Sequence, residues 1–104
     1  MSNRVLPDNA QPYARTPTFT AEQTPDSLLT HHDLKIGTWG LLKVEQGEVR
    51  FFSEDNTCAL AMLHAGETFV ILPEERHYIE VSNDAVFYVE FYNRNGAQST
   101  ACGE

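Results

Sequence analysis

The fold class follows from one stretch of the sequence, Gly66-Glu67-Thr68-Phe69-Val70-Ile71-Leu72-Pro73-Glu74-Glu75-Arg76-His77. A glycine opens a short apolar run, Pro73 ends it, and His77 follows at the start of the next apolar run. Short apolar runs between glycine and proline turns are typical of strands in an all-β protein. In a small barrel this order predicts that the imidazole of His77 lies at the barrel mouth, within reach of a metal or a small ligand.

The rest of the chain repeats this pattern of short runs and turns. Six strands are predicted, at 36–46, 48–53, 58–63, 68–72, 77–82 and 85–92. Two further strands are expected at 16–20 and 28–34, and no strong helix is predicted. Turn residues at intervals of roughly 8–12 residues favour a β-sandwich or barrel.

The length of 104 residues predicts a single domain. Residues 1–15 and 97–104 are polar and show no hydrophobic periodicity, so we expect a flexible N-terminal arm and a flexible tail. The β-barrel domain is therefore predicted to span residues 16–96.

The charge balance excludes several classes of partner. Seven basic and fifteen acidic residues give a net charge of −8, which argues against nucleic acid and anionic membranes as partners. No apolar run resembles a signal peptide or reaches the roughly 18 residues that a membrane helix needs. We therefore expect a cytoplasmic protein, in which Cys58 and Cys102 stay reduced.

Residues with metal-binding chemistry lie in the last two predicted strands. Alternation along the last strand places Glu90 on one face with Tyr88 and Tyr92, a combination that suits a polar pocket. On the preceding strand, His77 and Glu80 fall on opposite faces unless a bulge intervenes. Glu90 is therefore preferred over Glu80 as the carboxylate that meets His77.

Two imidazoles and one carboxylate with open positions suit divalent zinc, iron or manganese. The predicted metal ligands are His32, His77 and Glu90, with Glu80 in reserve. The pocket around them is predicted to be shaped by Trp39, Tyr88 and Tyr92. A plainer interpretation remains open, in which His77 bonds to the backbone at the rim and Glu90 pairs with Lys35.

Several motifs resemble those of a known family. The segments concerned are Thr16-Pro17-Thr18-Phe19-Thr20, Lys35-Ile36-Gly37-Thr38-Trp39-Gly40, His77-Tyr78-Ile79-Glu80 and Glu90-Phe91-Tyr92. They are similar to the cupin-like domain at the head of some tellurite-resistance methyltransferases, related to tellurite-resistance protein B and also found as a stand-alone protein of unknown function.

The resemblance implies an all-β, cupin-like double-stranded β-helix barrel of the jelly-roll type. It carries over four polar positions, namely His32, His77, Glu80 and Glu90. The first cupin motif is degenerate, because His31-His32 replaces the usual histidine pair and no glutamate lies near Trp39-Gly40. Leu34 also departs from the small polar residue expected at its position.

We therefore predict a small protein that binds a divalent metal and a small polar or anionic ligand such as an oxyanion. By resemblance, it is linked to resistance against tellurite or a related stress, and we expect a homodimer. Two alternatives remain, a metal-dependent oxygenase or isomerase, and a metal-free dimeric interaction module. The sequence shows no glycine-rich nucleotide loop, so methyl-transfer chemistry is not carried over.

Overall fold

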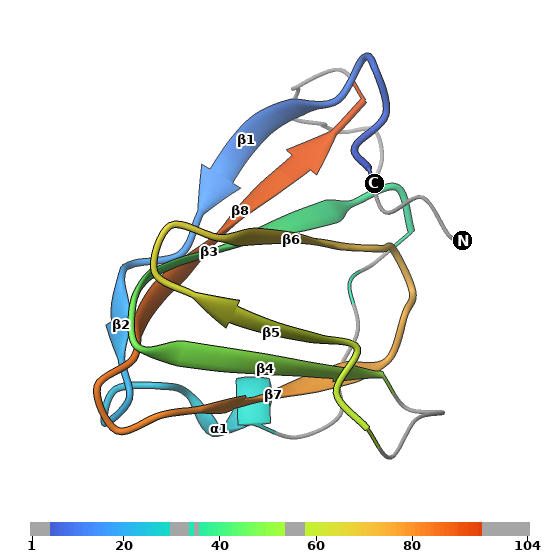
Figure 1. The fold of residues 1–104 in the computed structure, drawn as a ribbon. Coiled ribbons are helices and arrows are strands. Elements are labelled where there is room, and N and C mark those ends of the chain that lie inside the picture. The colour runs from blue at the N-terminus through green and yellow to red at the C-terminus, as the bar shows by residue number, and fades with distance from the viewer. Residues whose placement is uncertain (1–4, 30–33, 35, 54–57, 95–104) are drawn as a thin grey trace.

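The computed structural model describes residues 5–29, 34, 36–53 and 58–94, which form two antiparallel sheets (Figure 1). The strands are β1 (Gln11–Arg15), β2 (Phe19–Thr20), β3 (Trp39–Gln46), β4 (Glu48–Ser53), β5 (Ala61–His64), β6 (Thr68–Ile71), β7 (His77–Val81) and β8 (Val86–Asn93). The five-stranded sheet has the order β1-β8-β3-β6, with β2 also paired to β8. The three-stranded sheet has the order β5-β4-β7. The predicted all-β class is confirmed.

The chain passes between the two sheets several times. It crosses from β3 to β4 through a tight turn at Gly47, which adopts a φ of 74°. It returns to the five-stranded sheet at β6, crosses again to β7, and ends in β8. Since β8 pairs with β1, β2 and β3, the last strand lies at the centre of the larger sheet.

Three segments differ from the sequence prediction. Residues 11–15 were expected in a flexible arm, but they form β1 and pair with β8, with a bulge near Pro12. The strand predicted at 28–34 is replaced at its start by the short helix α1 (Asp26–Leu29), and residues 30–33 lie outside the described part of the chain. The first long strand begins at Trp39 and not at residue 36, because Gly37 turns the backbone with a φ of 80°.

The core lies between the two sheets. Alternation along each strand directs one set of apolar side chains inward, and the buried set is Leu42, Val44, Val49, Phe51, Leu63, Ile71, Ile79, Ala85, Phe87 and Val89. Aromatic rings fill part of this space, with Phe51 and Phe69 centroids 4.7 Å apart and Phe19 and Phe87 centroids 5.7 Å apart. Tilted rings at these separations add to the stabilisation from buried area.

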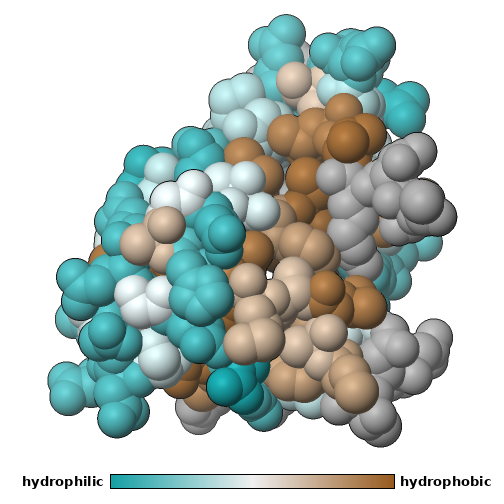
Figure 2. Space-filling model, viewed as in Figure 1, coloured by the Kyte–Doolittle hydropathy of each residue, from teal (hydrophilic) through white to brown (hydrophobic). Residues whose placement is uncertain are grey.

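The edges of both sheets meet on one face of the molecule. Figure 2 shows apolar side chains in a band down the middle of this view, where Figure 1 places β6 and β5. Exposed apolar residues of the protein include Ile36 and Met62, with exposed fractions of 78% and 52%. In the part of the chain that the structure describes, no helix is both long and apolar enough to span a membrane.

Candidate functional site

His77 is the first residue of β7 and points into the core. Its exposed fraction is 1%, and its ring stacks on that of Phe51 with centroids 4.9 Å apart and an interplanar angle of 21°. Nδ1 lies 2.7 Å from the backbone carbonyl oxygen of Glu75. Because a carbonyl oxygen only accepts hydrogen bonds, Nδ1 carries the hydrogen and donates it. The imidazole is therefore held at the inner wall of the sandwich.

A cavity of about 100 Å³ lies beside His77, between the two sheets. It is lined by Thr16, Leu28, Leu34, Leu42, Ile71, His77, Ile79, Val89 and Phe91. The hydroxyl of Thr16 donates to the carbonyl of Pro17 at 2.8 Å and accepts from the backbone N–H of Val89 at 3.1 Å. Its only hydrogen and one of its lone pairs are thus used by the backbone, and the cavity lining is apolar apart from the imidazole ring.

This cavity departs from the usual packing of protein interiors, which contain few voids larger than a water molecule. The cavity is partly open to the surrounding solvent and is not a sealed void. Apolar cavities of comparable size stay dry and bind small apolar molecules. The arrangement can therefore accept a compact apolar group, and it disfavours an ion.

Glu90 lies on the other side of the sheet, on the outer face of β8. Its carboxylate forms an ion pair of 3.1 Å with Lys43 and accepts a hydrogen bond of 3.1 Å from the hydroxyl of Tyr92. The hydrogen bond to Glu90 raises the pKa of Lys43. Burial first, and then the hydrogen bond to Glu90, raise the pKa of Tyr92. The partner of Glu90 is therefore Lys43, across the β3–β8 ladder.

The other predicted ligands do not join His77. Glu80 lies on the outer face of the three-stranded sheet, with Oε1 4.0 Å from Arg50. His32 lies outside the described residues. His77, Glu80 and Glu90 thus point to three different places, and no group of three histidine, cysteine or acidic side chains within the described ranges is placed to hold a metal ion.

The aromatic residues predicted to shape a pocket lie on the outer face of the five-stranded sheet. The ring of Tyr88 has the guanidinium of Arg15 at 4.0 Å from its centroid. The guanidinium of Arg94 lies 5.5 Å from the centroid of Trp39. Tyr92 shares this face through its bond to Glu90. These side chains form a cationic and aromatic surface, and none of them lines the internal cavity.

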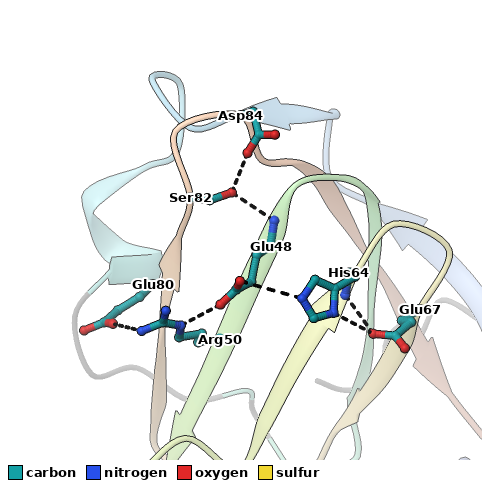
Figure 3. A network of polar contacts seen from close by, with 7 residues as sticks. All are labelled: Glu48, Arg50, His64, Glu67, Glu80, Ser82 and Asp84. Atoms are coloured by element: carbon teal, nitrogen blue, oxygen red, sulfur yellow. Dashed lines mark hydrogen bonds and ion pairs between the residues drawn. The ribbon is translucent and has the colours of Figure 1, made fainter.

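A polar network covers the outer face of the three-stranded sheet (Figure 3). The imidazole of His64 lies between two carboxylates, 3.7 Å from Glu48 and 3.6 Å from Glu67. Arg50 pairs with Glu48 at 2.7 Å, and this bond holds the pKa of the Glu48 carboxyl below its ordinary value. The contacts of His64 with Glu48 and Glu67 link β4 to β5 and to the turn before β6.

Comparison with known families decides the relationship of the chain. The family model of the TehB-like domain matches residues 14–89. The chain belongs to the TehB-like domain family. The relationship to tellurite-resistance protein B that the sequence motifs predict is therefore confirmed.

Two curated relatives of this TehB-like domain come from Haemophilus influenzae, strain 10810 and strain ATCC 51907 / DSM 11121 / KW20 / Rd. Each is named as a probable S-adenosyl-L-methionine-dependent methyltransferase TehB, and each is 26% identical over 76 residues. The match covers 69% of this chain and 27% of the relative. The chain thus spans about a quarter of the length of the curated relatives that it matches.

Two solved structures resemble the TehB-like domain described above. The crystal structure of TehB from Haemophilus influenzae superposes with a TM-score of 0.74 and 25% identity, over 84% of this chain and 32% of that chain. A crystal structure of a protein from Escherichia coli strain K12 superposes with a TM-score of 0.75 and 24% identity, over 85% of this chain and 94% of that chain. The second likeness concerns the fold alone.

These findings correct the predicted function. The relatives are named as S-adenosylmethionine-dependent methyltransferases, and the described residues assemble no metal ligands, so the prediction of a metal-binding cupin with a zinc, iron or manganese cofactor is wrong. The alternatives of a metal-dependent oxygenase or isomerase and of a metal-free dimeric interaction module have no support from these relatives. The homodimer, the stand-alone status and the exclusion of nucleic acid stay predictions.

The residues that line the cavity were missed by sequence reasoning. Leu42, Ile71 and Val89 have the pattern of ordinary core positions, because an unfilled volume leaves no mark on the residues around it. The one sequence feature that pointed to this place was His77, which was expected at a barrel mouth and is instead buried in the core beside the cavity.

Proposed function

We propose that this TehB-like domain works in S-adenosylmethionine-dependent methyl transfer and contributes a binding site for a small, largely apolar molecule. The observation that carries the proposal is the cavity beside His77, between the sheets. The names of the matched relatives support the link to methyl transfer.

The lining of the cavity defines the class of ligand. Transfer of a charged or unpaired polar group into such a lining carries a large desolvation cost. A cavity of about 150 Å³ lined by leucine, isoleucine and phenylalanine is known to hold benzene in another protein. The partly open space of about 100 Å³ in this domain is of the same order, so it suits a neutral alkyl group or a small aryl group. The small-molecule partner predicted from the sequence is retained, and an oxyanion is not favoured.

The same lining assigns the site to one side of the methyl-transfer reaction. S-adenosylmethionine carries a carboxylate, an ammonium and a sulfonium, and it is far larger than the cavity. We therefore assign the pocket to the methyl acceptor or to its methylated product. The imidazole of His77, oriented by its bond to Glu75, lies at the wall of this pocket.

Titration with toluene, followed by ¹H–¹⁵N NMR, tests the proposal. Native protein is expected to show saturable shifts at the residues that line the cavity. Val89→Phe places an aromatic ring in the cavity and is expected to abolish these shifts, whereas the matched control Val86→Phe changes the outward face of the same strand. Absence of binding to native protein would contradict the proposal. Shifts of the cavity residues with S-adenosylmethionine would overturn the assignment to the acceptor side.

The finer architecture is part of the proposal. We propose that the two sheets are the halves of a jelly-roll of the cupin type, closed where β5 and β6 approach each other. The support is the repeated passage of the chain between the sheets, from β3 to β4, from β5 to β6 and from β7 to β8. Slow amide exchange across the β5–β6 boundary would support closure, and rapid exchange there would argue for an open sandwich.

A further inference from the structure

Gly40 lies on β3 at the edge of the cavity and faces the interior. A Cβ atom at this position would lie 3.2 Å from Cδ1 of Leu34, 3.3 Å from Cγ1 of Val89 and 3.4 Å from Cβ of Ile71. All three of these residues line the cavity. Across the two ladders, Gly40 is paired with Ile71 on β6 and with Phe91 on β8, both of which also line it.

The backbone does not explain a glycine at this position. Among the described residues, the glycines with a positive φ are Gly37, Gly47 and Gly66, so Gly40 has a conformation that other residues adopt. Glycine is unfavourable inside a strand, where it offers no side chain to pack. The close approach of Leu34, Val89 and Ile71 to the backbone of β3 is therefore the feature that calls for a glycine at this place.

We infer that Gly40 sets the size limit of the pocket, so that the ligand class extends to a six-membered ring or a branched alkyl group. This inference rests on the proposed function, because it names the class of ligand for the same pocket. An alanine methyl would press on three lining side chains at once. Cβ of Ile71 is fixed to its backbone, so the methyl would displace the flexible end of Leu34 and reduce the space available to a ligand.

Two probes of different size measure this effect by NMR titration, dimethyl sulfide as the small one and toluene as the larger one. In Gly40→Ala, the dissociation constant for toluene is expected to rise about tenfold or more, while that for dimethyl sulfide changes by less than about threefold. Leu34→Ala removes the nearest contact and is expected to strengthen toluene binding. The double variant Gly40→Ala with Leu34→Ala is expected to recover toluene binding to near the native value.

The control is Leu41→Ala, which changes the outward neighbour of Gly40 and is expected to leave both dissociation constants unchanged. Equal toluene affinity of native protein and Gly40→Ala would overturn the inference. So would an equal loss of affinity for toluene and for dimethyl sulfide in a Gly40→Ala variant that still folds. If Gly40→Ala fails to fold, an unchanged ratio of the two constants in Leu34→Ala overturns it. Failure of native protein to bind either probe would instead contradict the proposed function.

Discussion

The interior of the domain has two halves that differ in packing. In one half, aromatic rings fill the space, with Phe51 against Phe69 at 4.7 Å and Phe19 against Phe87 at 5.7 Å. In the other half, mainly aliphatic side chains leave a cavity of about 100 Å³. Strand β8 contributes Phe87 to the filled half and Val89 to the cavity.

The difference between these halves lies in side-chain volume and not in polarity. Phe87 and Val89 are two residues apart on one face of the same strand, and both are apolar and buried. The core and the site therefore follow the same alternation of inward and outward residues. The site lies where smaller side chains leave volume unfilled, and where Gly40 lets three of them pack closely against the backbone of β3. Substitutions in the two halves should consequently separate effects on stability from effects on binding.

The largest effect is expected from Phe51→Ala in the filled half. Phe51 is fully buried and its ring contacts those of Phe69 and His77. Removal of such a ring typically lowers the free energy of unfolding by about 3–5 kcal/mol. Leu34→Ala, at the half-buried border of the cavity, is expected to cost about 1 kcal/mol. Urea unfolding measures both values, and similar costs would contradict the distinction between the two halves.

The strands and the inner face of the sheets follow from the sequence, whereas the division of the interior into two halves does not. The alternation in Gly66–His77 and in the last strand predicts the strands and the apolar inner face correctly. Alternation divides the residues of a strand between two faces, but it does not show which of the two faces borders a binding site. Glu90 was assigned to a pocket, yet its face is the outer one, because the opposite face of β8 carries the core residues Phe87 and Val89.

Other features depend on contacts between distant parts of the chain. The residues of β1 are all exposed and show no apolar alternation, so their place in the sheet comes from pairing with β8 and not from a local pattern. The cavity is a property of the space between two sheets, and its volume depends on how side chains from several strands meet. Neither could be obtained from local periodicity.

The second largest loss in the free energy of unfolding is expected from Gly47→Ala, in the turn between β3 and β4. Gly47 has a φ of 74°, and a Cβ atom there would lie 2.7 Å from Cα of Ala85 and 2.7 Å from Oγ of Ser82. Gly47→Ala should therefore lower the free energy of unfolding by at least about 2 kcal/mol. Gly40→Ala lacks a positive φ and presses mainly on the flexible end of Leu34, so it should lower the free energy of unfolding by less than Gly47→Ala does. Thermal unfolding compares the stabilities of the two variants, and an equal loss would show that Leu34 cannot move aside for the methyl group of Gly40→Ala.

The smallest effect on stability is expected from a substitution outside the interior, at Glu48 in the polar network on the outer face of the three-stranded sheet. The hydrogen bond from Arg50 is the main cause that lowers the pKa of Glu48 in the folded protein. A lowered folded pKa means that this carboxylate contributes stability above the ordinary glutamate value of about 4.3, and that the contribution is lost as the pH falls through the folded value.

Glu48→Gln should therefore lower the thermal midpoint slightly at pH 7, with a difference from native protein that shrinks as the pH falls below about 4. The matched control Glu45→Gln, at the exposed end of β3, should leave the thermal midpoint at pH 7 unchanged. Toluene binding should be the same in native protein and Glu48→Gln, because Glu48 lies on the outer face and does not line the cavity. A change in toluene affinity would mean that the outer network and the cavity are coupled, and the two halves of the interior could not then be treated as independent of the surface.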